Sequence, residues 1–330
     1  MSAVFTRDNL RVIFGCFGGD IVVCDIAAGK IISILSDHTS VVNSLCLSRD
    51  GKILVSGSWD KTVKLWDMES FACTATFYGH FGSVRTVKMS ADMQYVFCGS
   101  DDWQIWIWTV AGENIYKLRG HDGHVYAIDL FPDGKHLASA ACDHNIKLWD
   151  IETGECIFTL IGHWNWVSAL AVSPDGSLIA SGSYDTDVRI WNCLTGECVH
   201  WLRGHSSHIS AIAFFPDGKH VASGSYDKKV RVWDVVAGEC LTIVENHSHE
   251  VAALAISHDG TRIVSGSLDG SVVVYSPLHV LVSNFSLFQT WVVLETKRVQ
   301  KIVLTREAVR LIGFYVRLSS LAGKVTSESV

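Results

Sequence analysis

A histidine recurs through this chain at a nearly constant interval, and this periodicity limits the possible folds more than any other feature. The recurring histidines, His38, His80, His121, His163, His205 and His247, are 42, 41, 42, 42 and 42 residues apart. An aromatic residue follows each of them 28 positions later: Trp66, Trp108, Trp149, Trp191, Trp233 and Tyr275. A repeat of this period is typical of architectures in which one supersecondary unit packs only on copies of itself.

A seventh unit, shortened at its front, precedes these six. Residues 6–25 (TRDNLRVIFGCFGGDIVVCD) align with residues 48–67 (SRDGKILVSGSWDKTVKLWD), and Cys24 stands where the other units have an aromatic. Within each unit, short apolar runs are separated by turn signals such as SPDG and ETG, a pattern of four short strands. Each unit is therefore predicted to be a four-stranded antiparallel meander, and seven such sheets fit a closed ring.

This pattern resembles the WD-repeat (WD40) β-propeller family over residues 6–276. The resemblance implies an all-β fold, a seven-bladed β-propeller of four-stranded antiparallel blades, with the first blade incomplete at the N-terminus. We expect residues 1–276 to form the propeller and residues 277–330 to form an atypical C-terminal extension.

Two further polar positions accompany each histidine and aromatic, an Asp six residues and a Ser ten residues before the aromatic. In the WD-repeat family the matching residues form a hydrogen-bonded ladder, a structural role that the resemblance implies here. Such buried groups are tolerated only when each is paired. Cys98 replaces the Ser in one unit and Tyr275 replaces the Trp in another. The predicted ladder residues are His38, Ser56, Asp60, Trp66; His80, Asp102, Trp108; His121, Ser139, Asp143, Trp149; His163, Ser181, Asp185, Trp191; His205, Ser223, Asp227, Trp233; His247, Ser265, Asp269, Tyr275.

The Ser, His and Asp set could also suggest acyl transfer. A catalytic triad, however, is a single constellation beside an oxyanion site, whereas this set recurs in every unit. The Gly-rich segment 15–20 aligns with a strand turn of the next unit, and the pairs HDGH (121–124) and HSSH (205–208) lack the further ligands that a metal site requires. We therefore expect no enzyme activity, no cofactor and no metal.

The charge distribution, the hydropathy of the C-terminal segment and the cysteine spacing argue against nucleic-acid binding, a membrane span and secretion. Residues 277–330 contain seven Lys or Arg and three Asp or Glu, so the remaining 276 residues contain 20 basic and 31 acidic side chains. An acidic body argues against nucleic acid as the main partner. Residues 278–294 are too short and too polar to span a membrane. The ten cysteines contain no CxxC pair, which favours a reducing intracellular compartment, the cytoplasm or the nucleus.

The C-terminal extension allows two interpretations. In the first, residues 278–282 (LHVLV) form the outer strand of the last blade, and residues 299–305 (VQKIVLT) supply the inner strand that the first blade lacks. In the second, the chain is a fragment or an alternative product, and its tail is a poorly packed extension. The mixed apolar and basic composition of the extension favours neither interpretation.

Large aromatic residues mark one face of the predicted ring. Because the hairpins of a meander alternate between its two ends, the His-bearing and Asp-bearing loops open on the same face. Aromatic residues at turn positions are typical of binding hot spots. Trp106 replaces the cation found in other units and predicts either a lateral contact or local repacking. The candidate partner-binding residues are Trp59, Trp106, Trp164, Trp166, Tyr184, His208 and Tyr226.

The sequence thus favours a non-catalytic scaffold that binds partner proteins or peptides on this face and assembles them into a complex. The alternatives are a substrate-recognition subunit of a ubiquitin ligase or, less favoured, a propeller enzyme or a small-ligand binder. The arginine that some ligase receptors carry two residues after Trp-Asp is replaced here by Glu69, Glu152 and Val236. The oligomeric state is left open.

Overall fold

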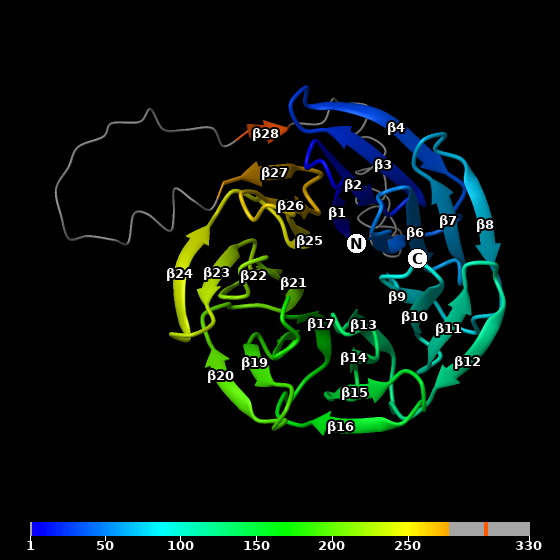
Figure 1. The fold of residues 1–330 in the computed structure, drawn as a ribbon. Helices are drawn as coiled ribbons and strands as arrows, with labels where there is room; N and C mark the ends of the chain where they lie inside the picture. The colour runs from blue at the N-terminus through cyan, green and yellow to red at the C-terminus, as the bar shows by residue number, and fades with distance from the viewer. Residues whose placement is uncertain (1, 277–299, 303–330) are drawn as a thin grey trace, which may run out of the picture.

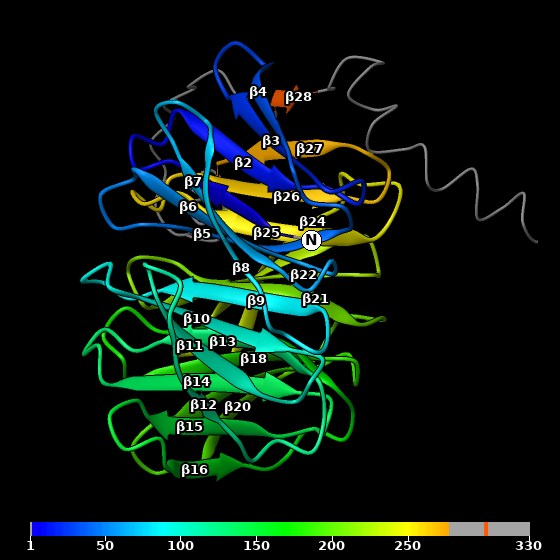
Figure 2. The same ribbon diagram turned by 90° about the vertical axis from the view of Figure 1, so that its right-hand side faces the viewer.

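The computed structural model describes residues 2–276 and 300–302, and these residues form seven four-stranded antiparallel sheets around a central channel. Figure 1 looks along the channel, and Figure 2 shows the ring edge-on. In every sheet each strand pairs with the next strand in sequence, from the channel outward. The prediction of an all-β, seven-bladed propeller is therefore confirmed.

The first four blades follow each other in chain order. Blade 1 contains β1 (Ala3–Phe5), β2 (Arg11–Gly15), β3 (Asp20–Asp25) and β4 (Lys30–Ser36). Blade 2 contains β5 (Val42–Leu47), β6 (Ile53–Ser58), β7 (Val63–Asp67) and β8 (Cys73–Phe77). Blade 3 contains β9 (Val84–Met89), β10 (Tyr95–Ser100), β11 (Ile105–Thr109) and β12 (Asn114–Leu118). Blade 4 contains β13 (Val125–Leu130), β14 (His136–Ala141), β15 (Ile146–Asp150) and β16 (Cys156–Leu160).

The remaining three blades complete the ring. Blade 5 contains β17 (Val167–Val172), β18 (Leu178–Ser183), β19 (Val188–Asn192) and β20 (Cys198–Leu202). Blade 6 contains β21 (Ile209–Phe214), β22 (His220–Ser225), β23 (Val230–Asp234) and β24 (Glu239–Val244). Blade 7 contains β25 (Val251–Ile256), β26 (Ile263–Ser267), β27 (Val272–Tyr275) and β28 (Gln300–Ile302).

The hydrophobic core lies between the blades. The buried apolar residues fall into seven clusters, and each cluster joins two neighbouring blades. The repeated Ser-Gly-Ser of the second strand serves this packing, because a Cβ atom on Gly182 would lie 2.3 Å from the Cγ2 atom of Ile209 in the next blade. Glycine at this position allows the close approach of adjacent sheets.

Ring closure differs from the sequence prediction. The inner strand of the first blade is β1, which has three residues where the other inner strands have six, so residues 299–305 do not supply it. Within that segment β28 pairs with β27 and forms the outer edge of blade 7. The prediction for residues 299–305 is wrong because three N-terminal residues suffice to pair with β2. Residues 278–282 lie outside the described residues.

The first and last blades are held together by packing and by two hydrogen bonds. Phe5 and Phe14 of blade 1 share a buried cluster with Val264 and Val272 of blade 7. The side-chain oxygen of Asn9 accepts a hydrogen bond from the backbone N–H of His258 at 3.0 Å. The backbone carbonyl of Asn9 accepts one from the guanidinium of Arg262 at 3.3 Å. The ring is thus closed by the same kind of interface that joins its other blades.

Candidate functional site

Each ladder aspartate first stabilises a tight turn between the second and third strands of its blade. In blade 5 the Oδ1 atom of Asp185 accepts the backbone N–H of Asp187 at 3.1 Å, and Thr186 between them has φ of 76°. This left-handed conformation costs an L-residue about 1 to 2 kcal/mol, which the side-chain hydrogen bond helps to offset. The same conformation follows the ladder aspartate at Lys61, Trp103, His144 and Lys228.

Four blades contain an unbroken ladder above this turn. In blade 5, Asp185 Oδ2 lies 2.7 Å from His163 Nδ1, and His163 Nε2 lies 2.8 Å from Ser181 Oγ. Trp191 Nε1 donates to the same Ser181 Oγ at 2.8 Å. Equivalent bonds of 2.6 to 2.8 Å join the ladder residues of blades 2, 4 and 6: His38, Ser56, Asp60, Trp66; His121, Ser139, Asp143, Trp149; His205, Ser223, Asp227, Trp233.

The ladder histidines favour the charged form of the ladder aspartates. Burial favours a raised pKa for Asp185, but the hydrogen bond and charge of His163 outweigh it and hold the pKa below the ordinary 3.8. The same balance lowers the pKa of Asp143 and Asp227. Burial lowers the pKa of His205, although Asp227 opposes this shift. The ladder aspartates therefore carry their charge in the folded protein at neutral pH.

Blade 3 has a different bond pattern. Trp106 Nε1 donates to Asp102 Oδ2 at 3.0 Å, and the His80 Nδ1 atom stays 3.9 Å from that carboxylate. Both ring nitrogens of His80 and the Nε1 atom of Trp108 are buried without a hydrogen-bond partner among the described residues. Burial lowers the pKa of His80 and raises that of the Cys98 thiol. The ladder of blade 3 is broken at every step.

The ladder is also incomplete in the blades at the two chain ends. In blade 7, His247 Nε2 lies 2.7 Å from Ser265 Oγ, but Nδ1 lies 2.9 Å from Ser271 Oγ and 3.9 Å from Asp269. The Tyr275 hydroxyl is buried and has no hydrogen-bond partner in the described part of the chain. Blade 1 has Phe14, Gly18 and Cys24 at the Ser, Asp and aromatic positions.

The ladder joins the strands of blades 2, 4, 5 and 6, and its serines are poorly placed for nucleophilic chemistry. The side chain of Ser181 is fully buried, and its hydroxyl lies between an imidazole and an indole. A nucleophilic serine must instead face a substrate beside an oxyanion site. The recurring Ser, His and Asp residues therefore stabilise the fold.

A continuous row of rings and one guanidinium lies on the face that carries the His-bearing and Asp-bearing loops. Tyr184 is central to it, with its ring centroid 4.1 Å from His208 in a stacked arrangement and 5.2 Å from Trp166. The row continues from His208 to Tyr226 at 5.7 Å and from Trp166 to Tyr126 at 6.0 Å. It extends to Arg85 and Trp59. We call Trp59, Arg85, Tyr126, Trp166, Tyr184, His208 and Tyr226 the channel arc.

Arg85 joins Trp59 to the rest of the channel arc. Its guanidinium carbon lies 4.8 Å from the ring centroid of Trp59 and 5.5 Å from that of Tyr126. Asp101 holds it through two bonds, at 2.7 Å to Nε and 2.8 Å to the terminal nitrogen. The Nδ1 atom of His124 lies 2.8 Å from the Asp101 carbonyl oxygen. A two-bond pair of this kind fixes the guanidinium plane against the two rings.

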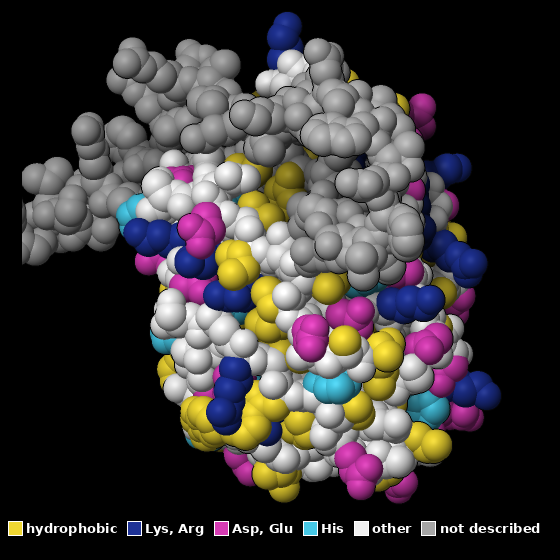
Figure 3. Space-filling model, turned by 90° about the vertical axis from the view of Figure 1, so that its left-hand side faces the viewer, with side chains coloured by type: hydrophobic (Ala, Val, Ile, Leu, Met, Phe, Trp, Pro, Cys, Tyr) yellow, Lys and Arg dark blue, Asp and Glu magenta, His cyan; other side chains and the backbone are white. Residues whose placement is uncertain are grey.

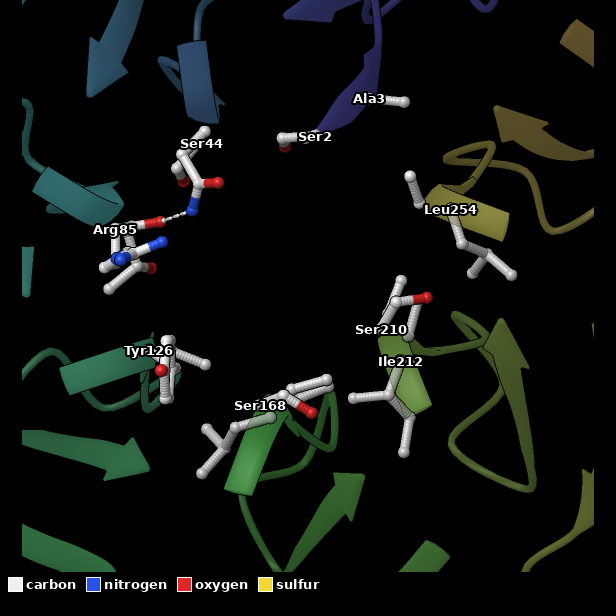
Figure 4. Close-up of a pocket in the computed structure, with 18 of the residues that line it drawn as sticks. Ser2, Ala3, Ser44, Arg85, Tyr126, Ser168, Ser210, Ile212 and Leu254 are labelled. Carbon is white, nitrogen blue, oxygen red and sulfur yellow. Dashed lines mark hydrogen bonds between the residues drawn. The ribbon is translucent and has the colours of Figure 1, made fainter. Parts of the chain in front are cut away.

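The channel arc borders part of a cavity of about 680 Å³ in the central channel. All arc residues except Trp166 line this cavity. Figure 4 shows Arg85 and Tyr126 on its wall together with residues from the other inner strands, such as Ser168 and Leu254. The Arg85 backbone carbonyl accepts a bond from Asn43 at 2.6 Å, which ties β9 to β5 behind the guanidinium.

The arc combines exposed ring surface with desolvated polar groups. Trp59, Trp166 and Tyr226 are 39, 41 and 38% exposed. Burial raises the pKa of Tyr126 to about 12, with Arg85 opposing the shift, and burial also raises the pKa of Tyr184. The Nδ1 atom of His208 is buried without a hydrogen-bond partner among the residues described. The arc therefore presents exposed ring surface over polar groups that are largely removed from solvent.

Two of the candidate partner-binding residues, Trp164 and Trp106, do not belong to the arc. Trp164 points to the outer edge of blade 5, where its ring centroid is 5.5 Å from that of Trp201. Trp106 is only 4% exposed, with its indole stacked 5.6 Å from Trp108. Trp106 therefore offers no surface for a lateral contact, because its side chain fills the core of blade 3.

Sequence reasoning missed Arg85 and Tyr126 because both lie on inner strands rather than in loops. They occupy the second residue of β9 and of β13, where the side chain faces the channel. The other full units have Asn43, Ser168, Ser210 and Ala252 at this position. Alignment of the units at this single position would have shown that two of them carry a large side chain where the others are small.

Residues 2–276 and 300–302 contain no group of three or more His, Cys, Asp or Glu side chains arranged to hold a metal ion. Over the same residues no helix is long and apolar enough to cross a membrane. All ten cysteines are free thiols.

Comparison with known proteins shows what the repeats are similar to. The sequence model of the family described as "WD domain, G-beta repeat" matches residues 29–67, 71–109, 112–150, 154–192, 196–234 and 238–276. Each matched segment begins near the outer strand of one blade and ends after the third strand of the next, so one sequence repeat links two blades. This offset couples neighbouring sheets covalently as well as by packing.

Individual relatives cover only part of this chain. It is 27% identical to "Nuclear distribution protein nudF" of Aspergillus niger over 40% of this chain and 34% of the relative. It is 28% identical to "Autophagy-related protein 16" of Arabidopsis thaliana over 45% and 29%, respectively. It is 30% identical to "Eukaryotic translation initiation factor 3 subunit I" of Culex quinquefasciatus over 42% and 46%. The chain thus spans less than half the length of these relatives.

The repeats matched by the family model cover well over half of the chain, and the seven blades have the strand order that these repeats require. The chain therefore belongs to the WD-repeat family of β-propellers.

Proposed function

We propose that this protein is a non-catalytic scaffold that binds a segment of a partner protein across the channel arc. The observation that carries the proposal is the unbroken row of contacts from Trp59 through Arg85 to Tyr226, which crosses five consecutive blades on one face. Aromatic and arginine side chains are the residue types enriched at interface hot spots.

The arc suits a protein partner better than a small apolar ligand. Its rings are held by each other and by the Arg85–Asp101 pair, so little side-chain entropy is lost on binding. The exposed indole of Trp166 and ring of Tyr226 lie toward opposite sides of the Tyr184–His208 stack, so a ligand that touches both must extend over the face.

The relatives support a scaffold role without identifying the partner. Their names associate them with nuclear distribution, autophagy and a multi-subunit translation initiation factor. Because these processes differ and the matches are partial, no single partner transfers to this chain. We further propose a reducing intracellular location, the cytoplasm or the nucleus, which the ten free thiols support.

The test compares an arc variant with a control of equal exposure. Tyr226→Ala removes a ring of the arc, whereas Tyr95→Ala removes a ring that is also 38% exposed but belongs to the hairpin end on the opposite face. Chemical crosslinking and capture from cell lysate should yield proteins bound by the intact chain and by Tyr95→Ala but depleted at least about tenfold with Tyr226→Ala. Equal capture by all three chains, with unchanged melting temperatures, would contradict the proposal.

A further inference from the structure

A second cluster of exposed rings lies on the outer edge of blade 5, separate from the channel arc. Trp201 on the edge strand β20 is 42% exposed, and Trp164 beside it is 57% exposed. Two guanidiniums lie over the Trp201 ring, with the central carbon of Arg203 at 3.6 Å and that of Arg189 at 4.3 Å from the ring centroid. We call Trp164, Arg189, Trp201 and Arg203 the edge cluster.

The two arginines of the edge cluster lack a carboxylate partner. Neither Arg189 nor Arg203 forms an ion pair with any carboxylate of the described residues, and the Nε atom of Arg189 is buried without a hydrogen-bond partner among them. Arg189 itself is only 7% exposed and lies beside the Cys198 thiol. Two like charges held over one ring repel each other unless an anion joins them.

In blade 2 the cation at the position of Arg189 is paired with a carboxylate of the same chain. Lys64 occupies the position of Arg189 and is paired with Asp37 at 2.5 Å. In blade 5 the residue that corresponds to Asp37 is Gly162, which has no side chain. Blade 5 therefore has no internal carboxylate at this position, and the guanidinium of Arg189 lies against Gly162 instead, where a Cβ atom would be 2.7 Å from its terminal nitrogen.

Apolar surface flanks the charged pair. Ile161 is 78% exposed and Val199, on the edge strand, is 48% exposed. Figure 3 views the molecule from the side on which β20 and β24 lie, and hydrophobic side chains gather with Lys or Arg at the level of β20. A partner bound at this edge would therefore place an acidic group against the arginines and apolar side chains beside it.

We propose that the edge cluster binds an acidic segment of a partner protein in which an Asp or Glu stands next to apolar residues. Its carboxylate would bind the exposed guanidinium of Arg203, on the same ring as the buried charge of Arg189, and its apolar side chains would cover Trp201, Trp164 and Ile161. Charge-assisted bonds from arginine to a carboxylate are strong and directional. A nucleic acid fits less well, because residues 1–276 contain 20 basic against 31 acidic side chains.

The edge cluster is a separate surface from the arc of the proposed function. Trp164 and Trp166 lie on either side of Asn165, yet Trp164 contacts Trp201 whereas Trp166 contacts Tyr126 and Tyr184. Variants of one surface can therefore be tested while the other stays intact.

The experiment uses a random peptide display library as the probe and the full chain as the bait. Selection is repeated with Arg203→Gln and with the control Arg119→Gln. Arg119 is also exposed, and it lies in the matching Leu-Arg-Gly-His sequence of the loop that leaves blade 3. Peptides that contain Asp or Glu beside apolar residues should be enriched with the intact chain and with Arg119→Gln. Their affinity should fall at least about tenfold with Arg203→Gln and be restored in part by Arg203→Lys.

Several outcomes would overturn the proposal. One is enrichment of peptides without acidic residues, or of acidic peptides that bind Arg203→Gln as well as the intact chain. Another is that no peptide is enriched while a DNA duplex or phosphatidylserine vesicles bind the intact chain and not Arg203→Gln. Trp201→Ala provides a second check, because selected peptides that bind it unchanged would show that the rings take no part.

Discussion

Blade 3 and blade 5 place an indole and a cation at the same cross-strand pair of positions, but in opposite order. Trp106 of β11 pairs with Lys117 of β12, whereas Arg189 of β19 pairs with Trp201 of β20. Both pairs form cation–π contacts, at 3.3 and 4.3 Å from the ring centroid. The two blades nevertheless differ throughout their ladders.

The difference arises on the third strand. With tryptophan at this position, the indole N–H of Trp106 reaches the ladder carboxylate of Asp102 and takes the place of His80. With arginine there, the ladder carboxylate of Asp185 stays with His163. In blade 3 a residue outside the ladder thus takes the position that the ladder histidine holds in blade 5.

The largest expected effect is that of removing a ladder histidine. His163→Ala should lower the free energy of unfolding by about 3 to 5 kcal/mol, because it leaves the buried carboxylate of Asp185 and hydroxyl of Ser181 without their partner. His80→Ala should cost about 2 to 3 kcal/mol less, since the His80 ring makes no hydrogen bond to described residues. Urea unfolding measures both values, and equal losses would show that the ladder bonds add nothing to packing.

Exchanging Ser and Cys between the two blades should have opposite effects. Ser181→Cys in blade 5 should destabilise by about 2 kcal/mol, because a thiol is a poor partner for both the imidazole and the indole. Cys98→Ser in blade 3 should stabilise by about 1 kcal/mol, since the hydroxyl can reach the orphaned nitrogens of His80 and Trp108. Thermal and urea unfolding of the two variants check the signs, and a shared sign would contradict this explanation.

Acidification should affect blade 3 through His80. Burial holds the pKa of folded His80 below the ordinary 6.5, so the unfolded chain binds a proton that the folded chain does not. Stability should therefore fall as the pH drops below 6.5, and His80→Ala should make this decline shallower. His205 contributes with the same sign, so the decline should persist in part. Unfolding curves at several pH values test this, and parallel profiles for the variant and the intact chain would refute it.

The smallest expected effect concerns the cation–π contact of blade 3. Lys117→Met keeps the aliphatic part of the side chain over Trp106 and removes the charge, and it should destabilise by about 0.5 to 1 kcal/mol. The contact should be insensitive to salt compared with an exposed ion pair such as Lys229–Glu245. Urea unfolding at low and high salt distinguishes the two, and an unchanged stability would show that Lys117 only covers the ring.

The period of about 42 residues and the alternation of apolar and turn residues were enough to predict the seven blades and to locate the ladder positions. Both are local properties, because each blade is a meander whose strands pair with their neighbours in sequence. The face that carries the arc followed from the alternation of hairpin ends. For Tyr184 and Tyr226, the turn position alone was sufficient to place the side chain on that face.

Contacts between blades could be found only in the tertiary structure. Arg85 contacts Tyr126 although the two residues are about one repeat apart in sequence. Trp164 and Trp166 have different neighbours, Trp201 and Tyr126 respectively, although a single residue separates them. The reason is geometric. Trp164 and Trp166 lie in the bend before β17, where the side chains do not follow the alternation of a strand, and equivalent positions of adjacent sheets lie side by side around the channel. The repeat by itself determined the seven-bladed propeller and the positions of the ladder residues. Packing between neighbouring sheets decided which aromatic side chains form the arc, which indole is buried and which arginines lack a carboxylate.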